Sequence, residues 1–369
     1  MTKPASSDKS LVGPAKGVFH YGPESLKALF QAWNQPPFRA VQVLEWVYQH
    51  GATDYEAMSN LPKALRSRLA EELPLYESNI VAKQVSEDGT VKMLLSWRDG
   101  ATSECVLIPK ERRRTVCVST QVGCPVGCVF CASGIGGLKR QLTAGQIVEQ
   151  TLRARQLCQD QDRLSNVVFM GLGEPLANYD ATVHAVRTIN ADWGVGIGAR
   201  KITISTVGLP TQMRRLADEG LQVTLALSLH APTDELRRVL IPWSKRVTIK
   251  ALIEAAEYYF KQTGREVTLE YVLLGGVNDS TTHAHKLSDI VRKMRNNINI
   301  LAYNPVEGLS YERPTALSVQ NFASTLRSRG INVNVRRSRG RDIDAACGQL
   351  RRRRNQAPRD ANSAAPQKP

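Results

Sequence analysis

Three cysteines near the middle of the chain have a spacing that suits an iron–sulfur centre. Cys124, Cys128 and Cys131 follow the pattern C-x3-C-x2-C, which differs from the paired cysteines of a zinc finger and from the four-cysteine run of bacterial ferredoxins. Three thiolates can ligate three irons of a [4Fe-4S] cluster and leave the fourth iron open. Because an open iron is a place where a reaction can occur, the triad predicts chemistry at a cluster rather than electron transfer alone.

Other polar or glycine-containing segments occur where predicted strands end. Met170-Gly-Leu-Gly-Glu-Pro175 follows one strand, Ser205 ends the next, and Ser228-Leu-His230 and Tyr303-Asn-Pro305 end two later ones. A single glycine turn or a single histidine is weak evidence, since most such residues serve the fold. Together these segments could line a pocket for a small zwitterionic cofactor, in which Glu174 would meet an ammonium group.

The elements that must position these residues alternate between strand and helix from Arg114 onward. Thr143 and Gln146 form a capping-box pattern, which predicts the start of a helix. Such alternation indicates a parallel sheet, and in a parallel barrel the loops after the strands carry the reactive groups. We therefore predict an α/β fold with a partial (β/α) barrel. Its expected strands are 115–118, 166–170, 201–204, 222–227, 266–273, 299–302 and 332–335.

The sequence divides into five parts around this barrel. Residues 1–20 are small and polar and are expected to form a disordered tail, while helical spacing of apolar residues in 21–76 predicts a helical accessory domain. Residues 77–110 have strand periodicity and Asp-Gly turns, so they are expected to form a β-hairpin linker segment. The barrel core is assigned to 111–350, and the basic tail 351–369 is expected to be disordered.

Composition limits the class of protein. The chain has 369 residues and 42% hydrophobic content, enough for a core domain and an accessory domain. It has neither a long apolar run nor an apolar leader, so we expect a cytoplasmic protein without a membrane span. Seven cysteines, three of them clustered, suit a reducing compartment in which cysteine indicates metal binding or catalysis. The net charge of +15 favours a polyanionic partner such as nucleic acid.

Four segments resemble the RlmN/Cfr family of radical S-adenosylmethionine enzymes. They are Cys117–Cys124, Phe169–Pro175, Ala226–Pro232 and Asp342–Leu350, and the similarity extends from Phe38 to Leu350. The resemblance implies a radical S-adenosylmethionine core that methylates an adenine of 23S ribosomal RNA. It also implies one [4Fe-4S] cluster on the three clustered cysteines and two molecules of S-adenosylmethionine per turnover.

The resemblance also carries over individual residues. Cys347 would accept a methyl group from a first S-adenosylmethionine, and a 5′-deoxyadenosyl radical made from a second would remove hydrogen from that methyl. The methylene radical would add to the adenine carbon, Glu104 would act as general base, and Cys117 would attack the Cys347 sulfur, forming a disulfide and freeing the methylated base. The cofactor contacts would be Gly173, Glu174, Ser205, Ser228, Leu229, His230 and Asn304.

The resemblance further implies partners. They are 23S ribosomal RNA, transfer RNA for some family members, and an electron donor such as a flavodoxin or a ferredoxin; the enzyme is expected to be a monomer. We expect phosphate contacts near the barrel mouth from Lys139, Arg140 and the run 112–114. With RNA as the substrate, the helical accessory domain 21–76 is expected to dock RNA.

Several alternatives stay open. RlmN-type enzymes methylate carbon 2 of adenine and Cfr-type enzymes methylate carbon 8, which confers antibiotic resistance; carbon 2 is favoured as the commoner activity. The segment 132–142 does not decide the position, and it leaves the transfer-RNA activity in doubt. The residues also permit a non-catalytic RNA-binding protein with structural zinc on the triad and Cys117, or a different radical enzyme such as a glycyl-radical activase. Glu104 could equally be an exposed strand residue, and Cys105 and Cys158 are expected only to pack.

Overall fold

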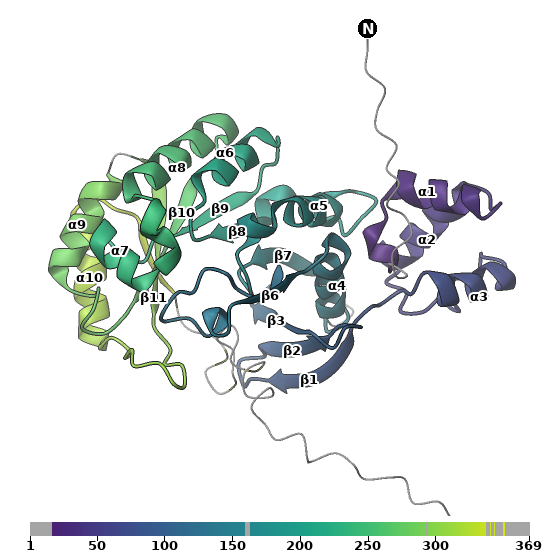
Figure 1. Ribbon diagram of the computed structural model, residues 1–369, viewed down its shortest axis with the longest axis horizontal. Coiled ribbons are helices and arrows are strands. Elements are labelled where there is room, and N and C mark those ends of the chain that lie inside the picture. Colours follow the sequence, from purple (N-terminus) through teal and green to yellow (C-terminus); the bar gives the residue numbers. More distant parts are fainter. Residues whose placement is uncertain are drawn as a thin grey trace, which may run out of the picture.

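One ten-stranded sheet organises the molecule. In the computed structural model (Figure 1), its strands follow the order β1-β2-β3-β4-β7-β8-β9-β10-β11-β12. The structure describes residues 17–158, 163–292 and 294–336, together with Gly340, Ile343 and Leu350. Among these residues no helix is both long and apolar enough to cross a membrane.

Within this ten-stranded sheet, the strands from β4 to β12 pair in parallel and form the predicted barrel wall. β12 and β1 are the two outer strands of the sheet and do not pair with each other, so the barrel is open and the predicted partial barrel is confirmed. The parallel strands are β4 Arg113–Cys117, β7 Leu164–Phe169, β8 Ile202–Thr206, β9 Thr224–Ser228, β10 Val267–Leu273, β11 Asn296–Ala302 and β12 Val333–Arg336.

Three antiparallel strands extend this sheet beyond its first parallel strand. They are β1 Asn79–Val85, β2 Val91–Ser96 and β3 Thr102–Lys110, and β3 pairs antiparallel with β4 through a register that joins Lys110 to Arg113. The segment 77–110 is therefore continuous with the barrel sheet. Its strand character was predicted, but its attachment to β4 depends on long-range pairing that alternation alone does not reveal.

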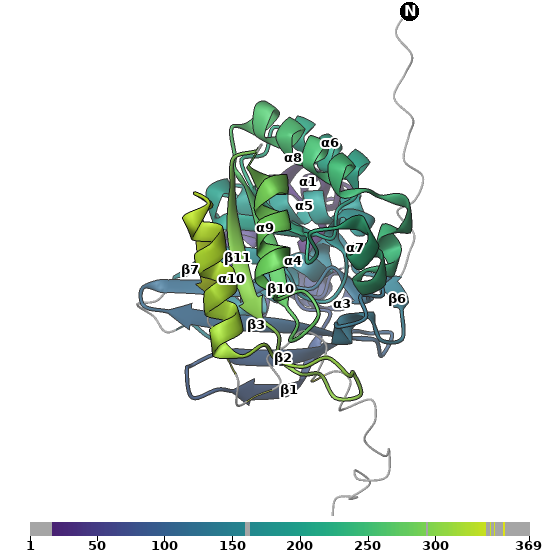
Figure 2. The same cartoon turned by 90° about the vertical axis from the view of Figure 1, so that its left-hand side faces the viewer.

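Helices cover the outer face of the sheet, as Figures 1 and 2 show from two directions. The predicted capping box is confirmed, since Gln146 N donates to Thr143 Oγ1 at 3.2 Å and Thr143 N donates to Gln146 Oε1 at 3.2 Å. The main apolar core lies between these helices and the sheet. The helices are α4 Ala144–Arg155, α5 Tyr179–Asn190, α6 Pro210–Asp218, α7 Asp234–Leu240, α8 Ile249–Thr263, α9 Thr281–Val291 and α10 Ala316–Ser328, with short 3-10 turns η3 Pro175–Asn178, η4 Ala199–Lys201 and η5 Pro242–Arg246.

A small helical unit precedes the sheet and packs beside α4 (Figure 1). It consists of η1 Val18–His20, α1 Pro23–Ala32, α2 Phe38–Tyr48 and α3 Lys63–Glu72. The assignment of residues 17–20 to a disordered tail is wrong, because Val18 and Phe19 are buried in the core and Val18 N donates to Pro74 O at 3.1 Å. Residues 1–16 and the tail 351–369 lie outside the described residues.

Candidate active site

The three clustered cysteines lie in a loop, residues 124–137, whose two ends are held together. β5 Gln121–Gly123 and β6 Leu138–Gln141 pair antiparallel at its base. Gly123 has a φ of +81°, and a Cβ there would lie 2.1 Å from Gly137 O, so only glycine allows this approach. We call this pairing of Gln121–Gly123 with Leu138–Gln141 the β5–β6 clasp. It could not be predicted from the sequence, because both strands are very short and lack an alternation of apolar and polar residues.

Apolar contacts seat the cysteine loop on the loops that follow the parallel strands. Phe130 packs edge-on against His230, with ring centroids 5.3 Å apart. A second apolar cluster, separate from the main core, joins the cysteine loop to the loops after β8, β9, β10 and β11. Its members include Val126, Phe130, Val207, Ala231, Leu274, Tyr303 and Val306. The structure thus gathers these loops at one place, the edge where the parallel strands end, which we call the carboxyl edge.

The three cysteine side chains have limited access to solvent: Cys124 is buried, and Cys128 and Cys131 are half-buried. Burial raises the pKa of Cys124 to about 12, and burial together with the neighbouring Cys131 and Cys124 raises the pKa of Cys128 well above its ordinary value. Metal binding would deprotonate such thiols. Among the described residues, no three Cys, His, Asp or Glu side chains converge as the ligands of one ion would. Three thiols on one loop whose two ends are paired are a donor set that suits an iron–sulfur cluster.

A buried arginine that the sequence analysis did not single out braces the same edge. Arg237 is 1% exposed, its Nε donates to Leu229 O at 3.2 Å, and its Nη2 donates to Val207 O. It therefore ties together the loops after β8 and β9. Its positive charge also acts to lower the pKa of Cys128. Two adjacent arginines in a short helix usually face solvent, so the burial of Arg237 beside Arg238 in α7 was not expected.

The turn after β7 fixes a buried carboxylate at the carboxyl edge. Gly173 has a φ of +107°, and a Cβ there would lie 2.6 Å from the Gln121 Cβ. Glu174 is buried; its Oε1 accepts from Leu176 N at 3.0 Å and its Oε2 accepts from Val207 N at 2.7 Å. Burial raises the pKa of Glu174 to about 7. A carboxylate offers about four lone-pair sites. The two N–H groups and the Thr206 side chain use three of them, so one remains for an ammonium group.

The other predicted cofactor contacts lie at the same edge, although they differ in how they could bind. The hydroxyls of Ser205 and Ser228 are 3.4 Å apart, and Asn304 Oδ1 accepts from Arg313 Nη1 at 2.6 Å. The Leu229 side chain is buried in the main core, so any contact it makes must come from its backbone. The His230 ring differs from these groups because a backbone hydrogen bond fixes its orientation.

His230 is a neutral imidazole with a fixed orientation. Its φ is +58°, and its Nδ1 accepts a hydrogen bond from Val272 N at 3.2 Å. Burial, with a smaller contribution from the Arg237 charge, lowers the pKa of His230 to about 3. Because Nδ1 is the acceptor, Nε2 carries the proton and remains the only donor of the ring. His230 can therefore present an N–H, but no charge, to a ligand.

Glu104 and Cys117 face the same side of the sheet. Lys92, Val106 and Cys117 are cross-strand neighbours in one row, and Glu104 lies two residues from Val106, so all four side chains point to one face. This is the inner face, opposite the helices, because the alternate residues Cys105 and Leu107 belong to the main core.

Glu104 forms a buried ion pair, which excludes the exposed alternative. Lys92 Nζ lies 2.9 Å from Glu104 Oε2, and the two side chains are 0% and 3% exposed. Ser119 Oγ donates to Glu104 O at 2.6 Å and so fixes β3 to the segment that follows β4. Lys92 was not predicted to be part of the site, because a lysine between Val91 and Met93 is expected to point to solvent. One signal for this ion pair was available in the sequence: a lysine within an apolar strand, followed by a strand that carries a glutamate.

Comparison with known proteins identifies the family. A model described as "Ribosomal RNA large subunit methyltransferase N-terminal domain" matches residues 18–74, and one described as "Radical SAM superfamily" matches 118–287. The chain is 45% identical over 352 residues to a "Probable dual-specificity RNA methyltransferase RlmN" of Rhodopirellula baltica, covering 95% of each chain. The chain belongs to the RlmN family of radical S-adenosylmethionine RNA methyltransferases.

Further relatives agree with this membership. A protein with the same RlmN description from Geobacillus kaustophilus is 44% identical, with 92% of this chain and 93% of the relative covered. A crystal structure of a radical SAM methyltransferase from Sphaerobacter thermophilus superposes with a TM-score of 0.89 at 44% identity, covering 90% of this chain and 98% of that one. The radical S-adenosylmethionine fold predicted from the sequence is confirmed, and membership of the RlmN family implies both a [4Fe-4S] cluster and S-adenosylmethionine.

Not every expected site residue of this RlmN-family chain can be placed. Cys347 lies outside the described residues, so its role and its disulfide with Cys117 stay predictions. Cys105 is buried with its Sγ directed at Gln150 O at 3.4 Å, and the Cys158 Sγ lies 3.8 Å from Ala154 O. Both agree with the expected packing role.

Three observations on charged residues change the expected site. Arg113 and Arg114 begin β4, whereas Cys117 ends it, so the prediction that 112–114 lie near the barrel mouth is wrong. Arg140 on β6 is paired with Asp99 at 2.5 Å. Glu270 was not foreseen: it is buried on β10, and it accepts from Asn299 Nδ2 at 2.8 Å.

Proposed function

We propose that this protein methylates a ring carbon of adenine in 23S ribosomal RNA, and that the carbon is C2. The observation that carries the proposal is the common inner face of Glu104 and Cys117, with Lys92 paired to Glu104, beside the seated cysteine loop. An RNA-binding protein without catalysis has no use for a thiol on the same face as a buried carboxylate that is paired with a lysine. The C2 position is supported by relatives described as RlmN.

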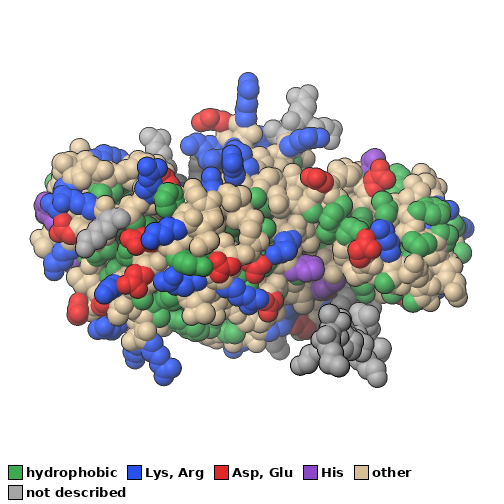
Figure 3. Space-filling model, turned by 90° about the horizontal axis from the view of Figure 1, so that it is seen from above, with side chains coloured by type: hydrophobic (Ala, Val, Ile, Leu, Met, Phe, Trp, Pro, Cys, Tyr) green, Lys and Arg blue, Asp and Glu red, His purple; other side chains and the backbone are tan. Residues whose placement is uncertain are grey.

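Transfer RNA is proposed as a second substrate. The relatives from Rhodopirellula baltica and Geobacillus kaustophilus are described as dual-specificity enzymes, and the net charge of +15 suits any folded RNA. In the space-filling view, Lys and Arg side chains are spread over the face and are more frequent than Asp and Glu (Figure 3). Such a surface attracts RNA without selecting one molecule. We propose a cytoplasmic location for the same reason, since both substrates are found there.

Cofactor binding is assigned to the residues gathered at the carboxyl edge. Cys124, Cys128 and Cys131 would hold the [4Fe-4S] cluster, with Arg237 stabilising the thiolate of Cys128. Glu174 would accept from the ammonium group of S-adenosylmethionine, next to Gly173, which permits close approach. Polar contacts to the rest of the molecule would come from Ser205, Ser228, the Leu229 backbone, His230 Nε2 and Asn304. When bound, the cluster and S-adenosylmethionine supply the radical chemistry that an unactivated aromatic carbon requires.

Glu104 and Cys117 would complete the transfer. Cys347 is proposed to carry the methyl group and to become joined to the adenine carbon through it. Glu104 would accept the proton of that ring carbon, with Lys92 positioning the carboxylate. The Cys117 thiolate would attack the Cys347 sulfur, so that a sulfur–sulfur bond forms as the carbon–sulfur bond to RNA breaks. A reductant of the disulfide and an electron donor such as a flavodoxin or a ferredoxin are required.

The position of methylation can be tested directly by nucleoside mass spectrometry. The gene is expressed in a host that lacks its native RlmN enzyme, and nucleosides from 23S ribosomal RNA and transfer RNA are analysed. We expect 2-methyladenosine in both. A peak of 8-methyladenosine instead would replace the C2 assignment with the Cfr-type activity, and absence of both would overturn the proposed function.

The roles of Glu104 and Cys117 have their own test. Glu104→Gln and Cys117→Ala should each remove methyladenosine and accumulate a covalent protein–RNA complex, visible as a slowly migrating band that ribonuclease collapses. Glu71→Gln, at an exposed carboxylate of α3, is the matched control and should behave as the wild type. Loss of product without any covalent complex would contradict the assigned roles.

A further inference from the structure

A basic pocket lies at the end of the sheet opposite the candidate active site. It has a volume of about 430 Å³ and is lined by Lys110, Glu111, Arg112, Arg113, Ser165, Asn166 and Lys201. These residues come from the turn between β3 and β4, the start of β7 and the residue before β8. The pocket therefore sits where the parallel strands begin, and we call it the amino-edge pocket.

The charge of the amino-edge pocket is not balanced by the protein. It contains four exposed cations and one acid. Within the described part of the chain, Lys110, Arg112, Arg113 and Lys201 have no ion-pair partner, whereas arginines elsewhere do, as in Arg187–Glu219 at 2.7 Å and Arg215–Asp180 at 2.8 Å. Like charges this close repel one another, so a bound anion would relieve a repulsion that the protein leaves in place.

The turn that carries these cations is held in a fixed conformation. Lys110 pairs with Arg113 across a two-residue turn, and Glu111 has a φ of +49°, a conformation that favours glycine. Arg114 Nη1 donates to Glu111 O at 2.7 Å, and Arg114 N donates to Ser165 Oγ at 3.1 Å. These bonds tie the turn to β7, so little conformational freedom is lost when the pocket binds a ligand.

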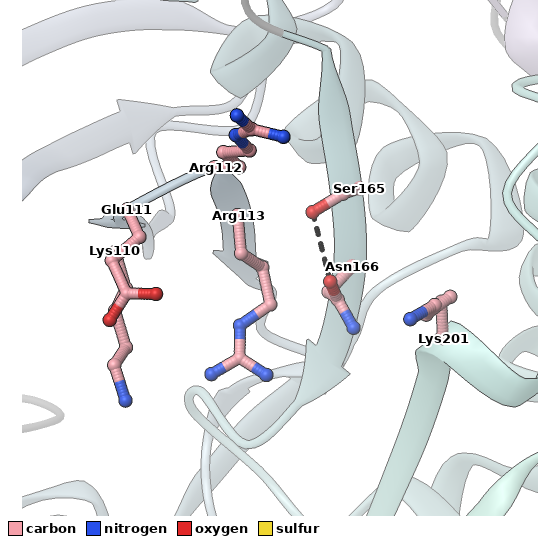
Figure 4. Close-up of a pocket in the computed structure, with 7 residues that line it drawn as sticks. All are labelled: Lys110, Glu111, Arg112, Arg113, Ser165, Asn166 and Lys201. Atoms are coloured by element: carbon pink, nitrogen blue, oxygen red, sulfur yellow. Dashed lines mark hydrogen bonds between the residues drawn. The ribbon is translucent and has the colours of Figure 1, made fainter.

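The pocket presents donors to whatever enters it. Figure 4 shows Lys110 and Arg113 extending in the same direction from the turn and Lys201 pointing toward Asn166. Ser165 Oγ lies 2.9 Å from Asn166 Oδ1, and when the serine donates in this contact the amide NH2 of Asn166 is left as a donor. Ammonium, guanidinium and amide groups are the set that proteins use for phosphate oxygens.

We propose that the amino-edge pocket holds backbone phosphates of a second segment of the RNA whose target adenine lies at the carboxyl edge. This rests on the proposed function, since RNA must be the substrate. β4 spans Arg113 to Cys117, so the two edges are only about 13 Å apart at roughly 3.3 Å per residue. A folded RNA that places one loop at the carboxyl edge can therefore reach the amino edge with a neighbouring strand.

The salt dependence of binding tests this proposal. The double variant Arg113→Gln/Lys201→Gln is compared with wild type for binding deproteinised 23S ribosomal RNA over a range of salt concentrations. Each lost phosphate contact lowers the slope of log K against log salt by about 0.7 to 0.9, so the slope should become shallower by about 1.4 to 1.8. A short hairpin that spans one edge only should show the same slope with both proteins.

Two further variants keep the test specific. Lys261→Gln/Lys286→Gln removes the same charge from exposed positions on α8 and α9 and should leave the slope unchanged. Arg113→Lys/Lys201→Arg keeps both charges and should retain the wild-type slope. An unchanged slope in the pocket variant, or an equal change in the α8/α9 variant, would overturn the proposal.

Nucleoside analysis of the same RNA separates this proposal from the proposed function. Methyladenosine with an unchanged slope would reject the pocket alone. A shallower slope without methyladenosine would reject the proposed activity and leave the pocket as an RNA contact.

Discussion

A buried lysine is the ion-pair partner of Glu104. A carboxylate that is 3% exposed would be costly to bury alone, and the Lys92 ammonium at 2.9 Å compensates its charge. The pair lies on the same face of the sheet as Cys117. An ionised carboxylate can accept a proton, whereas a protonated one cannot. Lys92 is therefore a positioning residue that acts through Glu104.

Two variants at the Lys92–Glu104 pair should distinguish its contribution to the free energy of unfolding from its contribution to methylation. Lys92→Met leaves Glu104 without its cation, and we expect a loss of about 3–5 kcal/mol in the free energy of unfolding together with loss of methyladenosine. The double variant Lys92→Met/Glu104→Gln should regain much of the stability and none of the activity, because a neutral amide needs no cation and cannot act as a base.

Urea unfolding and nucleoside mass spectrometry measure the two effects. Lys83→Met, at an exposed lysine of β1, is the control and should change neither. If the double variant were no more stable than Lys92→Met, the charge argument would be wrong and Lys92 would serve only packing.

At the scale of elements, the β5–β6 clasp determines whether the three cysteines are presented together. The cysteine loop contains several glycines and no regular structure apart from η2 Ala132–Gly134. Its conformation therefore depends on the pairing of Gln121–Gly123 with Leu138–Gln141 and on the Phe130–His230 contact. Loosening the clasp would let the thiols separate and would raise the entropic cost of ligating a cluster.

Substitution at Gly123 tests the clasp. Gly123→Ala would place a Cβ 2.1 Å from Gly137 O at a φ of +81°, so the pairing must shift. We expect iron and sulfide content after anaerobic reconstitution to fall to less than half of the wild-type value. Gly100→Ala is the matched control, since its φ is +75° but its Cβ would have nothing within 4 Å. Both variants carry a backbone strain of about 1–2 kcal/mol, so equal iron content in the two would contradict the role of the clasp.

At the scale of the whole molecule, Glu77 joins the N-terminal helical unit to the barrel. Its Oε1 accepts from Gly17 N at 2.6 Å and lies 2.8 Å from His20 Nε2, and its Oε2 faces Gln146 of α4 at 3.4 Å. Burial opposes ionisation, but the hydrogen bonds from His20 and Gly17 outweigh it and hold the pKa of Glu77 below its ordinary value of 4.5. The ionised carboxylate therefore stabilises the joint.

This joint should weaken in acid. Because the pKa of Glu77 is lower in the folded chain, its contribution is fully present above pH 4.5 and is lost as the pH falls through the folded-state value. Glu77→Gln should lower the free energy of unfolding by about 1.5–3 kcal/mol at pH 7, and this difference should shrink below pH 4.5. Urea unfolding at several pH values measures it, with Glu24→Gln at an exposed ion pair of α1 as control. A difference that does not change with pH would show that the carboxylate charge has no part in the joint.

The fold was largely predictable from the sequence because its signals are local. Each parallel strand is an apolar run ended by a turn, so the predicted ranges overlap β4 and β7 to β12. The site was predicted in outline, because its loops follow those strands. Lys92 and Arg237 were missed because their burial depends on partners distant in sequence. The run 112–114 was predicted at the carboxyl edge, which is wrong. It precedes Cys117 in the same strand, so the sequence itself indicates that it lies at the end where the parallel strands begin.

The attachment of β3 to β4 limits how this enzyme can be divided. A fragment beginning at Arg113 would expose the whole hydrogen-bonding edge of β4, and unpaired edges of this kind associate with other chains. The segment that matches the radical SAM model begins even later, at residue 118, and omits β4 itself. A fragment that keeps the edge of β4 paired must therefore include β3, which precedes the segment that carries the cysteines.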